Sequence, residues 1–189
     1  MTGHRFNPEK ADKLMSAERR KLLPIDKVIE LLELHAHDTV ADLGAGNGYF
    51  TIPFAKQTKK SVYAVDIEPK MLELLKMNAE KERLKNIHYI ESDLEHIQLE
   101  DSSVNKVLIA FVMHEVGNMV NALNEVKRIL KPQGKLLILE WEAIESEQGP
   151  PLHERIPSKE MEKFLRDHGF DVQASHLNEA VYAMLATLS

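Results

Sequence analysis

Three glycines at alternate positions, Gly44, Gly46 and Gly48, follow the short apolar run Thr39 to Asp42. Glycine has no Cβ atom, so such a run lets the chain turn tightly and lets a ligand approach the backbone itself. A strand that leads through a tight turn into a helix also presents backbone N–H groups at the start of that helix. The stretch "TVADLGAGNGYF" therefore predicts a ligand-binding turn.

An acidic residue, Asp66, ends the next apolar run and stands twenty residues after Gly46. In an open α/β sheet, an acid at this place accepts hydrogen bonds from the hydroxyl groups of a ribose. The dinucleotide fingerprint GxGxxG is not matched, because Tyr49 stands where its third glycine would be, and no GxxxxGK[ST] phosphate loop is present. A nucleoside without phosphate groups therefore fits better than a dinucleotide.

His114 and Glu115 are the candidates for acid–base chemistry, because they end a hydrophobic run on the expected ligand side and histidine titrates near neutral pH. A histidine at the end of a strand is more often structural, so both roles stay open. Glu140 and Trp141 are candidates for lining a substrate pocket, although a core position also suits the tryptophan. The run "ERRK", Glu18 to Lys21, is typical of a solvated helix face.

Alternating strand and helix patterns supply the elements that must position these residues. Apolar residues at helical spacing after Pro24 predict a helix over residues 25–32. We expect further helices over residues 49–57, 69–82 and 118–130, and strands over residues 39–42, 61–66, 87–90, 106–113 and 135–141. Strands that alternate with helices indicate a parallel sheet covered on both faces.

The segment after Leu130 begins with "KPQG", residues 131–134, which predicts a turn. Residues 142–157 show no clear period and are expected to form a long loop, which in compact domains is often functional. A helix is predicted over residues 158–168, with Ser158 as its N-cap and Gly169 as its stop.

Two closing runs, residues 172–177 and 181–188, are joined by a short turn around Asn178. This pattern predicts an antiparallel hairpin. The expected fold class is therefore α/β: a doubly wound, Rossmann-like, mostly parallel sheet of seven strands that ends in an antiparallel hairpin.

Composition limits the classes of function. The 189 residues suit one domain, and the formal net charge of −6 argues against nucleic acid as a partner. The chain has no cysteine, which excludes disulfides and sulfur-based metal sites, and the spacing of His35 and His37 is not typical of a metal site, so we expect no metal. The N-terminus has no apolar signal segment, and the longest apolar run, Val107 to Met113, is too short to cross a bilayer. These features predict a soluble cytoplasmic protein without membrane insertion.

The motifs together resemble those of the class I S-adenosylmethionine-dependent methyltransferases, in particular the small single-domain "type 11" members similar to ubiquinone/menaquinone methyltransferases. The family pattern (V/I)LDxGxGxG is matched by residues 40–48, and "RILKPQGKLLILEW" is similar to the family's "rvLkPGGxlxixd". The resemblance covers roughly residues 40–188. It implies a methyltransferase domain over residues 24–189, preceded by an N-terminal cap segment over residues 1–23.

The resemblance also implies a cofactor, S-adenosylmethionine, whose product is S-adenosylhomocysteine. It implies that Asp66 binds the ribose, that Ile67 packs on the adenine, that Asp93 meets the adenine amine, and that His114 faces the substrate. The residues expected to hold the cofactor are Asp42, Gly44, Ala45, Gly46, Gly48, Tyr49, Asp66, Ile67, Asp93, Leu94, Ala110 and Phe111.

Two departures from the family pattern bear on the substrate. Asn105 replaces the acid usual before the fourth strand, and residues 110–113 lack the proline-rich motif of enzymes that methylate nucleic-acid amines. We therefore expect methyl transfer to a small-molecule acceptor, with the N-terminal segment and the loop over residues 142–157 covering the pocket. The alternative is a non-catalytic S-adenosylmethionine-binding protein or a subunit of a partner enzyme; the oligomeric state stays open.

Overall fold

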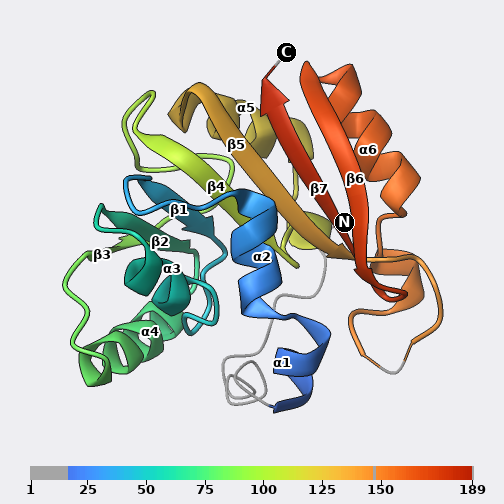
Figure 1. The fold of residues 1–189 in the computed structure, drawn as a ribbon. Helices are drawn as coiled ribbons and strands as arrows, with labels where there is room; N and C mark the ends of the chain where they lie inside the picture. Colours follow the sequence, from blue (N-terminus) through green and yellow to red (C-terminus); the bar gives the residue numbers. More distant parts are fainter. Residues whose placement is uncertain (1–16, 147, 189) are drawn as a thin grey trace.

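The computed structural model describes residues 17–146 and 148–188, which form a seven-stranded sheet with the order β3-β2-β1-β4-β5-β7-β6 (Figure 1). The pairs within β3-β2-β1-β4-β5 are parallel, whereas β7 runs antiparallel to both β5 and β6. The predicted α/β sheet and its C-terminal hairpin are thereby confirmed. The strands are β1 Val40–Leu43, β2 Val62–Asp66, β3 Ile87–Glu91, β4 Val104–Ala110, β5 Leu130–Trp141, β6 Phe170–Asn178 and β7 Val181–Leu188.

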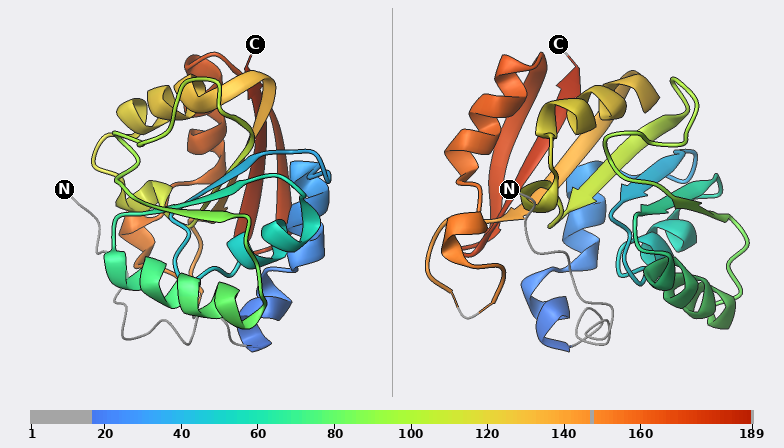
Figure 2. Two further views of the ribbon diagram at one scale, coloured as in Figure 1. Left: turned by 90° about the vertical axis from the view of Figure 1, so that its left-hand side faces the viewer. Right: turned by 180° about the vertical axis from the view of Figure 1, so that it is seen from behind.

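Helices cover both faces of the sheet. One buried apolar cluster joins α2, α3 and α4 to one face, and a second joins α5 and α6 to the other, as the two views of Figure 2 show. The helices are α1 Ala17–Leu22, α2 Ile25–Leu32, α3 Thr51–Gln57, α4 Pro69–Lys81, α5 Met119–Ile129 and α6 Ser158–Asp167, with short 3₁₀ turns η2 Met113–Glu115 and η3 Leu152–Glu154.

The central strand β1 shows why the strands appear in the sequence as continuous apolar runs. All four of its residues are buried. Ala41 and Leu43 pack toward α5, while Val40 packs in the cluster on the opposite face. A parallel strand between two helical layers has no solvent-facing side, so its sequence does not alternate between apolar and polar residues.

The strand predicted over residues 106–113 ends earlier, at Ala110, and the prediction is wrong for its last three residues. Phe111 takes a left-handed conformation with φ of 62°, and its N–H group donates the last hydrogen bond to the Leu139 carbonyl at 2.8 Å. The chain then turns into η2 rather than continuing the strand. This turn directs His114 and Glu115 away from the line of the sheet.

One predicted turn and one predicted helix cap also differ from the structure. The "KPQG" segment lies inside β5, where Val104 pairs with Leu130 and Lys106 with Lys135, so it forms a bulge. The N-cap of α6 is Pro157 rather than Ser158, and the Ser158 N–H group donates to the carboxylate of Glu142 at 3.1 Å.

The expected N-terminal cap segment is described only from residue 17, since residues 1–16 lie outside the described part of the chain. Helix α1 is fastened where it ends. The Tyr49 hydroxyl donates to the Leu23 carbonyl at 2.8 Å, and the Asn178 amide donates to the Leu22 carbonyl at 2.9 Å. Through Tyr49, the segment after the glycine turn therefore holds α1 beside that turn.

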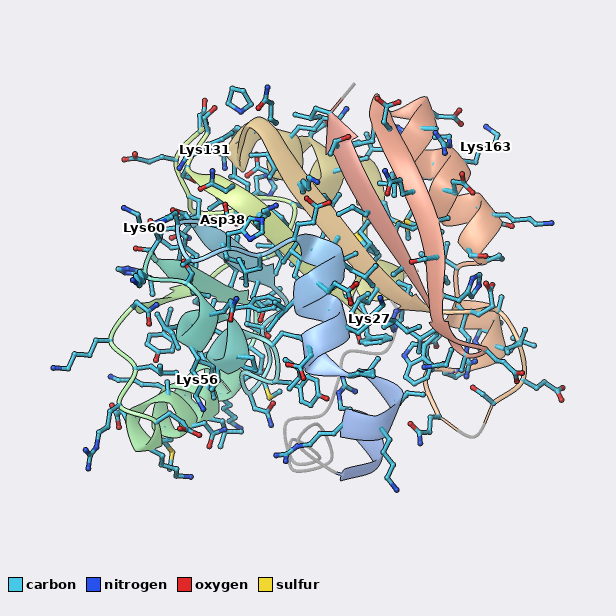
Figure 3. All side chains as sticks on the ribbon, viewed as in Figure 1. Lys27, Asp38, Lys56, Lys60, Lys131 and Lys163 are labelled. Atoms are coloured by element: carbon cyan, nitrogen blue, oxygen red, sulfur yellow. The ribbon has the colours of Figure 1, made fainter. Side chains whose placement is uncertain are left out.

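Charged side chains gather on the outside of the molecule. Lys27, Lys56 and Lys163 are exposed and point away from the sheet (Figure 3). Within the described residues, no helix is both long enough and apolar enough to cross a membrane.

Replacing Tyr49 with phenylalanine should lower the free energy of unfolding by about 1 to 2 kcal/mol, because the buried Leu23 carbonyl loses its donor. Urea unfolding followed by circular dichroism measures the loss. Tyr63→Phe is the control, since the Tyr63 hydroxyl makes no hydrogen bond with any described residue and its ring lies against His88. Equal losses in the two variants would contradict the proposed anchoring of α1.

Candidate functional site

A cavity of about 210 Å³ lies beyond the carboxyl ends of β1, β2 and β4. The chain proceeds from β1 outward to β2 and β3, and then returns to place β4 on the other side of β1. Open α/β sheets bind ligands at such a switch point, because the two loops diverge there. The cavity is lined by Arg19, Gly44, Gly46, Asp66, Ile67, Glu68, Met71, Leu94, Ala110, Phe111, Val112 and Glu115.

The glycine turn is required by both backbone conformation and space. Gly44 has φ of 79°, and a Cβ atom there would lie 2.3 Å from Cγ2 of Val112. A Cβ atom at Gly48 would lie 2.9 Å from Cγ of Leu75, so this glycine allows the start of α3 to approach α4. Gly44 therefore shapes the cavity, whereas Gly48 serves helix packing behind it.

The carboxylate of Asp66 is held at the cavity by two backbone N–H groups. Its Oδ2 atom accepts the Gly46 N–H at 2.8 Å, and its Oδ1 atom accepts the Glu68 N–H at 2.9 Å. Burial raises the pKa of this carboxyl group, while the N–H donors act in the opposite direction. Since a carboxylate oxygen accepts more than one hydrogen bond, both oxygens remain able to receive ligand hydroxyl groups. Ile67 beside it is 41% exposed and offers an apolar surface.

Asp42 supports the turn from behind and does not line the cavity. It is 2% exposed, and its Oδ2 atom accepts the Thr51 hydroxyl at 2.5 Å. Burial raises the pKa of Asp42 to about 7; the charge of Asp66 adds to the rise, and the Thr51 hydroxyl limits it. This carboxyl group therefore titrates close to neutral pH in the folded protein.

Eight of the residues predicted for the site meet at the cavity, and six lie behind or beside it. Asp93 belongs to the second group: its Oδ1 atom accepts the N–H groups of Glu95 and His96 at 2.9 and 2.8 Å, so this carboxylate also stabilises its own loop. The residues at the cavity are Gly44, Gly46, Asp66, Ile67, Leu94, Ala110, Phe111 and Glu115; the others are Asp42, Ala45, Gly48, Tyr49, Asp93 and His114.

Arg19 is a cavity residue that the sequence did not reveal. The interpretation of "ERRK" as a solvated face is wrong for this residue, because its guanidinium group lies 5.3 Å from the Phe111 ring and 5.5 Å from the Tyr49 ring. Burial lowers the pKa of Arg19. A cation between two aromatic rings is held by their π-electrons. Nothing in the sequence around Arg19 indicates this contact, because Phe111 lies far from it along the chain.

His114 lies behind the cavity wall, with its side chain 5% exposed. Its Nδ1 atom is 2.9 Å from Oε1 of Glu140, whose side chain is fully buried, and its Nε2 atom is 3.8 Å from Oε1 of Glu115. Burial lowers the pKa of His114, but the hydrogen bond to Glu140 and the charges of Glu140, Glu115 and Glu154 outweigh it and raise the pKa above 6.5. Glu140 and Trp141, proposed as pocket residues, are buried and support the wall from behind.

Acidic and histidine side chains could also suggest a metal. Across residues 17–146 and 148–188, no group of three or more such side chains is arranged to hold one. The polar groups that line the cavity are the carboxylates of Asp66, Glu68 and Glu115, the guanidinium group of Arg19 and the backbone of the glycine turn.

Comparison with known proteins gives a consistent result. Residues 41–138 match the sequence model of a family described as "Methyltransferase domain". The chain is 29% identical over 128 residues to the ubiquinone/menaquinone biosynthesis C-methyltransferase UbiE of Acidiphilium cryptum, covering 67% of this chain and 51% of that protein. It is 37% identical over 112 residues to UbiE of Bartonella henselae, covering 58% of this chain and 43% of that protein. The chain thus spans about half the length of the curated relatives it matches.

One solved structure matches along almost the whole chain. It is described as a SAM dependent methyltransferase from Aquifex aeolicus, with a TM-score of 0.92 and 29% sequence identity. The match covers 98% of this chain and 100% of that one. The mostly parallel seven-stranded architecture is therefore shared by both proteins.

Replacing Gly44 with alanine should cost about 2 to 4 kcal/mol of folding free energy, because backbone strain of about 1 to 2 kcal/mol adds to the overlap with Val112. Gly169→Ala is the matched control, since Gly169 has a similar φ of 81° but its nearest neighbour would be Nζ of Lys127, 4.0 Å away. Urea unfolding compares the two. The same loss in both would show that Val112 does not confine the turn.

The buried Asp42 carboxyl group predicts a pH dependence of stability. Its pKa is about 7 in the folded protein against 3.8 as the ordinary value, so the folded state binds the proton more tightly. The free energy of unfolding should therefore fall as pH rises from about 4 to about 7. In Asp42→Asn this fall should be smaller, as measured by urea midpoints across that range. An unchanged fall would mean that Asp42 ionises freely.

Proposed function

Since the chain belongs to the methyltransferase domain family, we propose that it binds S-adenosylmethionine in the cavity beside Asp66 and transfers its methyl group to a small-molecule acceptor. The carboxylate of Asp66 carries this proposal. Two backbone N–H groups hold it in one orientation at the end of β2, where it faces the cavity. A carboxylate fixed in this way suits the paired hydroxyl groups of a ribose.

The surroundings of Asp66 fit the adenine as well. Ile67, Met71 and Leu94 give the cavity apolar walls. Of the two carboxylate oxygens of Asp93, only Oδ1 accepts backbone hydrogen bonds from described residues. We therefore assign the other oxygen, Oδ2, to the adenine amine. The two acids then hold the ribose and the base from neighbouring loops.

The remaining part of the cavity fits the methionine portion. The turn at Gly44 leaves space beside Ala110 and Phe111, and Arg19 is the cation among the lining residues that would face the carboxylate. When bound, S-adenosylmethionine supplies an electrophilic methyl group on a positively charged sulfur. Asp66, Glu68 and Glu115 give the cavity the negative charge that suits such a ligand.

The protein's contribution to the reaction is mainly alignment. Holding two reactants in line lowers a barrier by about 7 to 11 kcal/mol. Arg19 from α1 and Phe111 from the end of β4 line the cavity, and the contact between their side chains limits the space left for water beside the reactants. The relatives from Acidiphilium cryptum and Bartonella henselae are named C-methyltransferases of ubiquinone and menaquinone biosynthesis, which supports a small-molecule acceptor here.

The domain boundaries and the location of the protein belong to the same proposal. We propose that residues 24–189 act as one methyltransferase domain with residues 1–23 as its cap, and that the protein works in the cytoplasm. The net charge of −6 supports a small acceptor rather than nucleic acid.

Replacing Asp66 with asparagine should weaken S-adenosylmethionine binding by about 10- to 100-fold, because hydrogen bonds to a charged acceptor are lost and the new amide opposes the Gly46 N–H group. Isothermal titration calorimetry with S-adenosylmethionine measures the change. Asp38→Asn is the matched control: Asp38 also accepts a backbone N–H, but it precedes β1 at the opposite edge of the sheet (Figure 3). Equal affinity in wild type and Asp66→Asn would overturn the ribose assignment.

Catalysis is tested by release of S-adenosylhomocysteine in the presence of candidate acceptors. A panel that includes the shape-matched pair 1-naphthol and 1-naphthylamine separates hydroxyl and carbon acceptors from amines. Tight binding of S-adenosylmethionine without turnover of any acceptor would favour the alternative, a non-catalytic binding protein.

A further inference from the structure

We propose that Glu115, His114 and Glu140 form a proton relay that leads from the cavity into the protein, and that the methyl acceptor is therefore a hydroxyl or an acidic carbon rather than an amine. This inference rests on the proposed methyl transfer. It assigns a different part to each residue: Glu115 contacts the acceptor as a catalytic base, whereas His114 and Glu140 are positioning residues behind it.

The inner end of the relay is a carboxylate without access to solvent. Glu140 is 0% exposed, and its oxygens lie 2.9 and 3.0 Å from Nδ1 of His114. The same carboxylate accepts the backbone N–H groups of His114 at 3.3 Å and of Trp141 at 3.1 Å. Because a carboxylate oxygen accepts the hydrogen bond from Nδ1, this contact places the proton of the neutral His114 ring on Nδ1. The Nε2 atom of the neutral ring is then left as a proton acceptor.

The outer end of the relay reaches the cavity. Nε2 of His114 lies 3.8 Å from Oε1 of Glu115, whose side chain is 21% exposed and lines the cavity. In a 3₁₀ turn, successive side chains point about 120° apart. The turn η2 therefore directs His114 toward β5 and Glu115 toward the ligand. The early end of β4 at Phe111 is what makes this division possible.

A purely structural role accounts poorly for Glu140. Burying a carboxylate is costly, and a buried ion pair is often no more stabilising than apolar side chains of similar volume. The chain also contains a comparable pair on its surface, in which His176 is 52% exposed and lies 3.2 Å from Glu142. The buried pair differs from it by lying directly behind a cavity residue, where ionisable groups with shifted pKa values are often functional.

The proton balance of the step is complete without a further reactant. The acceptor's O–H or C–H bond breaks, and its electron pair forms the new bond to the methyl carbon, while the pair of the former carbon–sulfur bond stays on sulfur. The released proton passes to the carboxylate of Glu115 and then to Nε2 of His114. The resulting imidazolium lies between the carboxylates of Glu115 and Glu140 and later returns its proton to solvent through Glu115.

Three acidic side chains of the described residues raise the pKa of His114. Glu115 faces it from the same turn, Glu140 from β5 and Glu154 from η3. Together they favour the protonated ring, so the neutral, accepting form is populated only as pH rises through a value above the usual 6.5. The relay therefore predicts a rate of methyl transfer that increases with pH, with its midpoint at the pKa of His114.

Nuclear magnetic resonance titration of the histidine ring protons, assigned with His114→Gln, tests the positioning. We expect a His114 pKa above 6.5 in the wild type and a fall of about one pH unit in Glu140→Gln. Glu154→Gln is the matched control, because it removes a facing charge without removing the Nδ1 hydrogen bond, and its shift should be smaller. Equal shifts in the two variants, or none in Glu140→Gln, would overturn the relay.

The pH–rate profile tests the function. With 1-naphthol as acceptor, Glu140→Gln should move the rising limb to lower pH together with the measured His114 pKa, and Glu115→Gln should lower turnover about 100-fold or more. In the wild type, turnover of 1-naphthylamine should be lower than that of 1-naphthol. A rising limb at the same pH in Glu140→Gln and in the wild type would overturn the relay. Turnover of 1-naphthylamine without turnover of 1-naphthol would also overturn it.

Calorimetry separates this proposal from the proposed function. Glu140→Gln should bind S-adenosylmethionine as the wild type does, because Glu140 does not line the cavity. If the wild type fails to bind S-adenosylmethionine, the proposed function itself is wrong. If it binds the cofactor and methylates an acceptor with a pH limb that Glu140→Gln does not move, only the relay is wrong.

Discussion

The geometry of the whole site depends on the way three successive backbone N–H groups are tied to the end of β2. Those of Gly44 and Ala45 donate to the Val65 carbonyl at 2.7 and 3.0 Å, and that of Gly46 donates to Asp66 at 2.8 Å. A glycine turn is flexible by composition, and these bonds remove that freedom. The carboxylate that would grip the ligand is therefore the group that fixes the turn around it.

The main elements could be predicted because their physics is local. Each parallel strand is buried on both faces and each helix shows one apolar face, so hydrophobic runs and periodicity locate them. The ends of the elements were less predictable. Nothing in the sequence around Phe111 indicates a left-handed residue, because φ of 62° there is held by packing against Trp141 and by a hydrogen bond to β5.

The same distinction holds for the site. Asp66 and the glycines follow from their positions at strand ends, which a parallel sheet brings to one edge. Arg19 could not be located in this way, and Glu140 was expected in the pocket rather than in its buried position behind His114, because each residue depends on a contact between distant segments. Tyr49 and Asn178 hold the end of α1 so that Arg19 reaches the cavity, and the role proposed for Glu140 depends on the end of β4 at Ala110. Long-range packing, rather than local pattern, decides the role of both residues.

The family match covers only part of the candidate site. Residues 41–138 contain the glycine turn, Asp66 and the His114–Glu115 turn, whereas Arg19 and Glu140 lie outside them. The matched part thus contains the residues assigned to the adenine and the ribose, together with His114 and Glu115. Outside the match, Arg19 of α1 is assigned to the methionine carboxylate, whereas Glu140 at the end of β5 and Glu154 of η3 face His114. Since a fold fixes the place of a site but not its chemistry, the acceptor has to be deduced from these residues. Burying the carboxylate of Glu140 behind His114 costs folding free energy. That cost is explained if the acceptor must lose a proton before it is methylated.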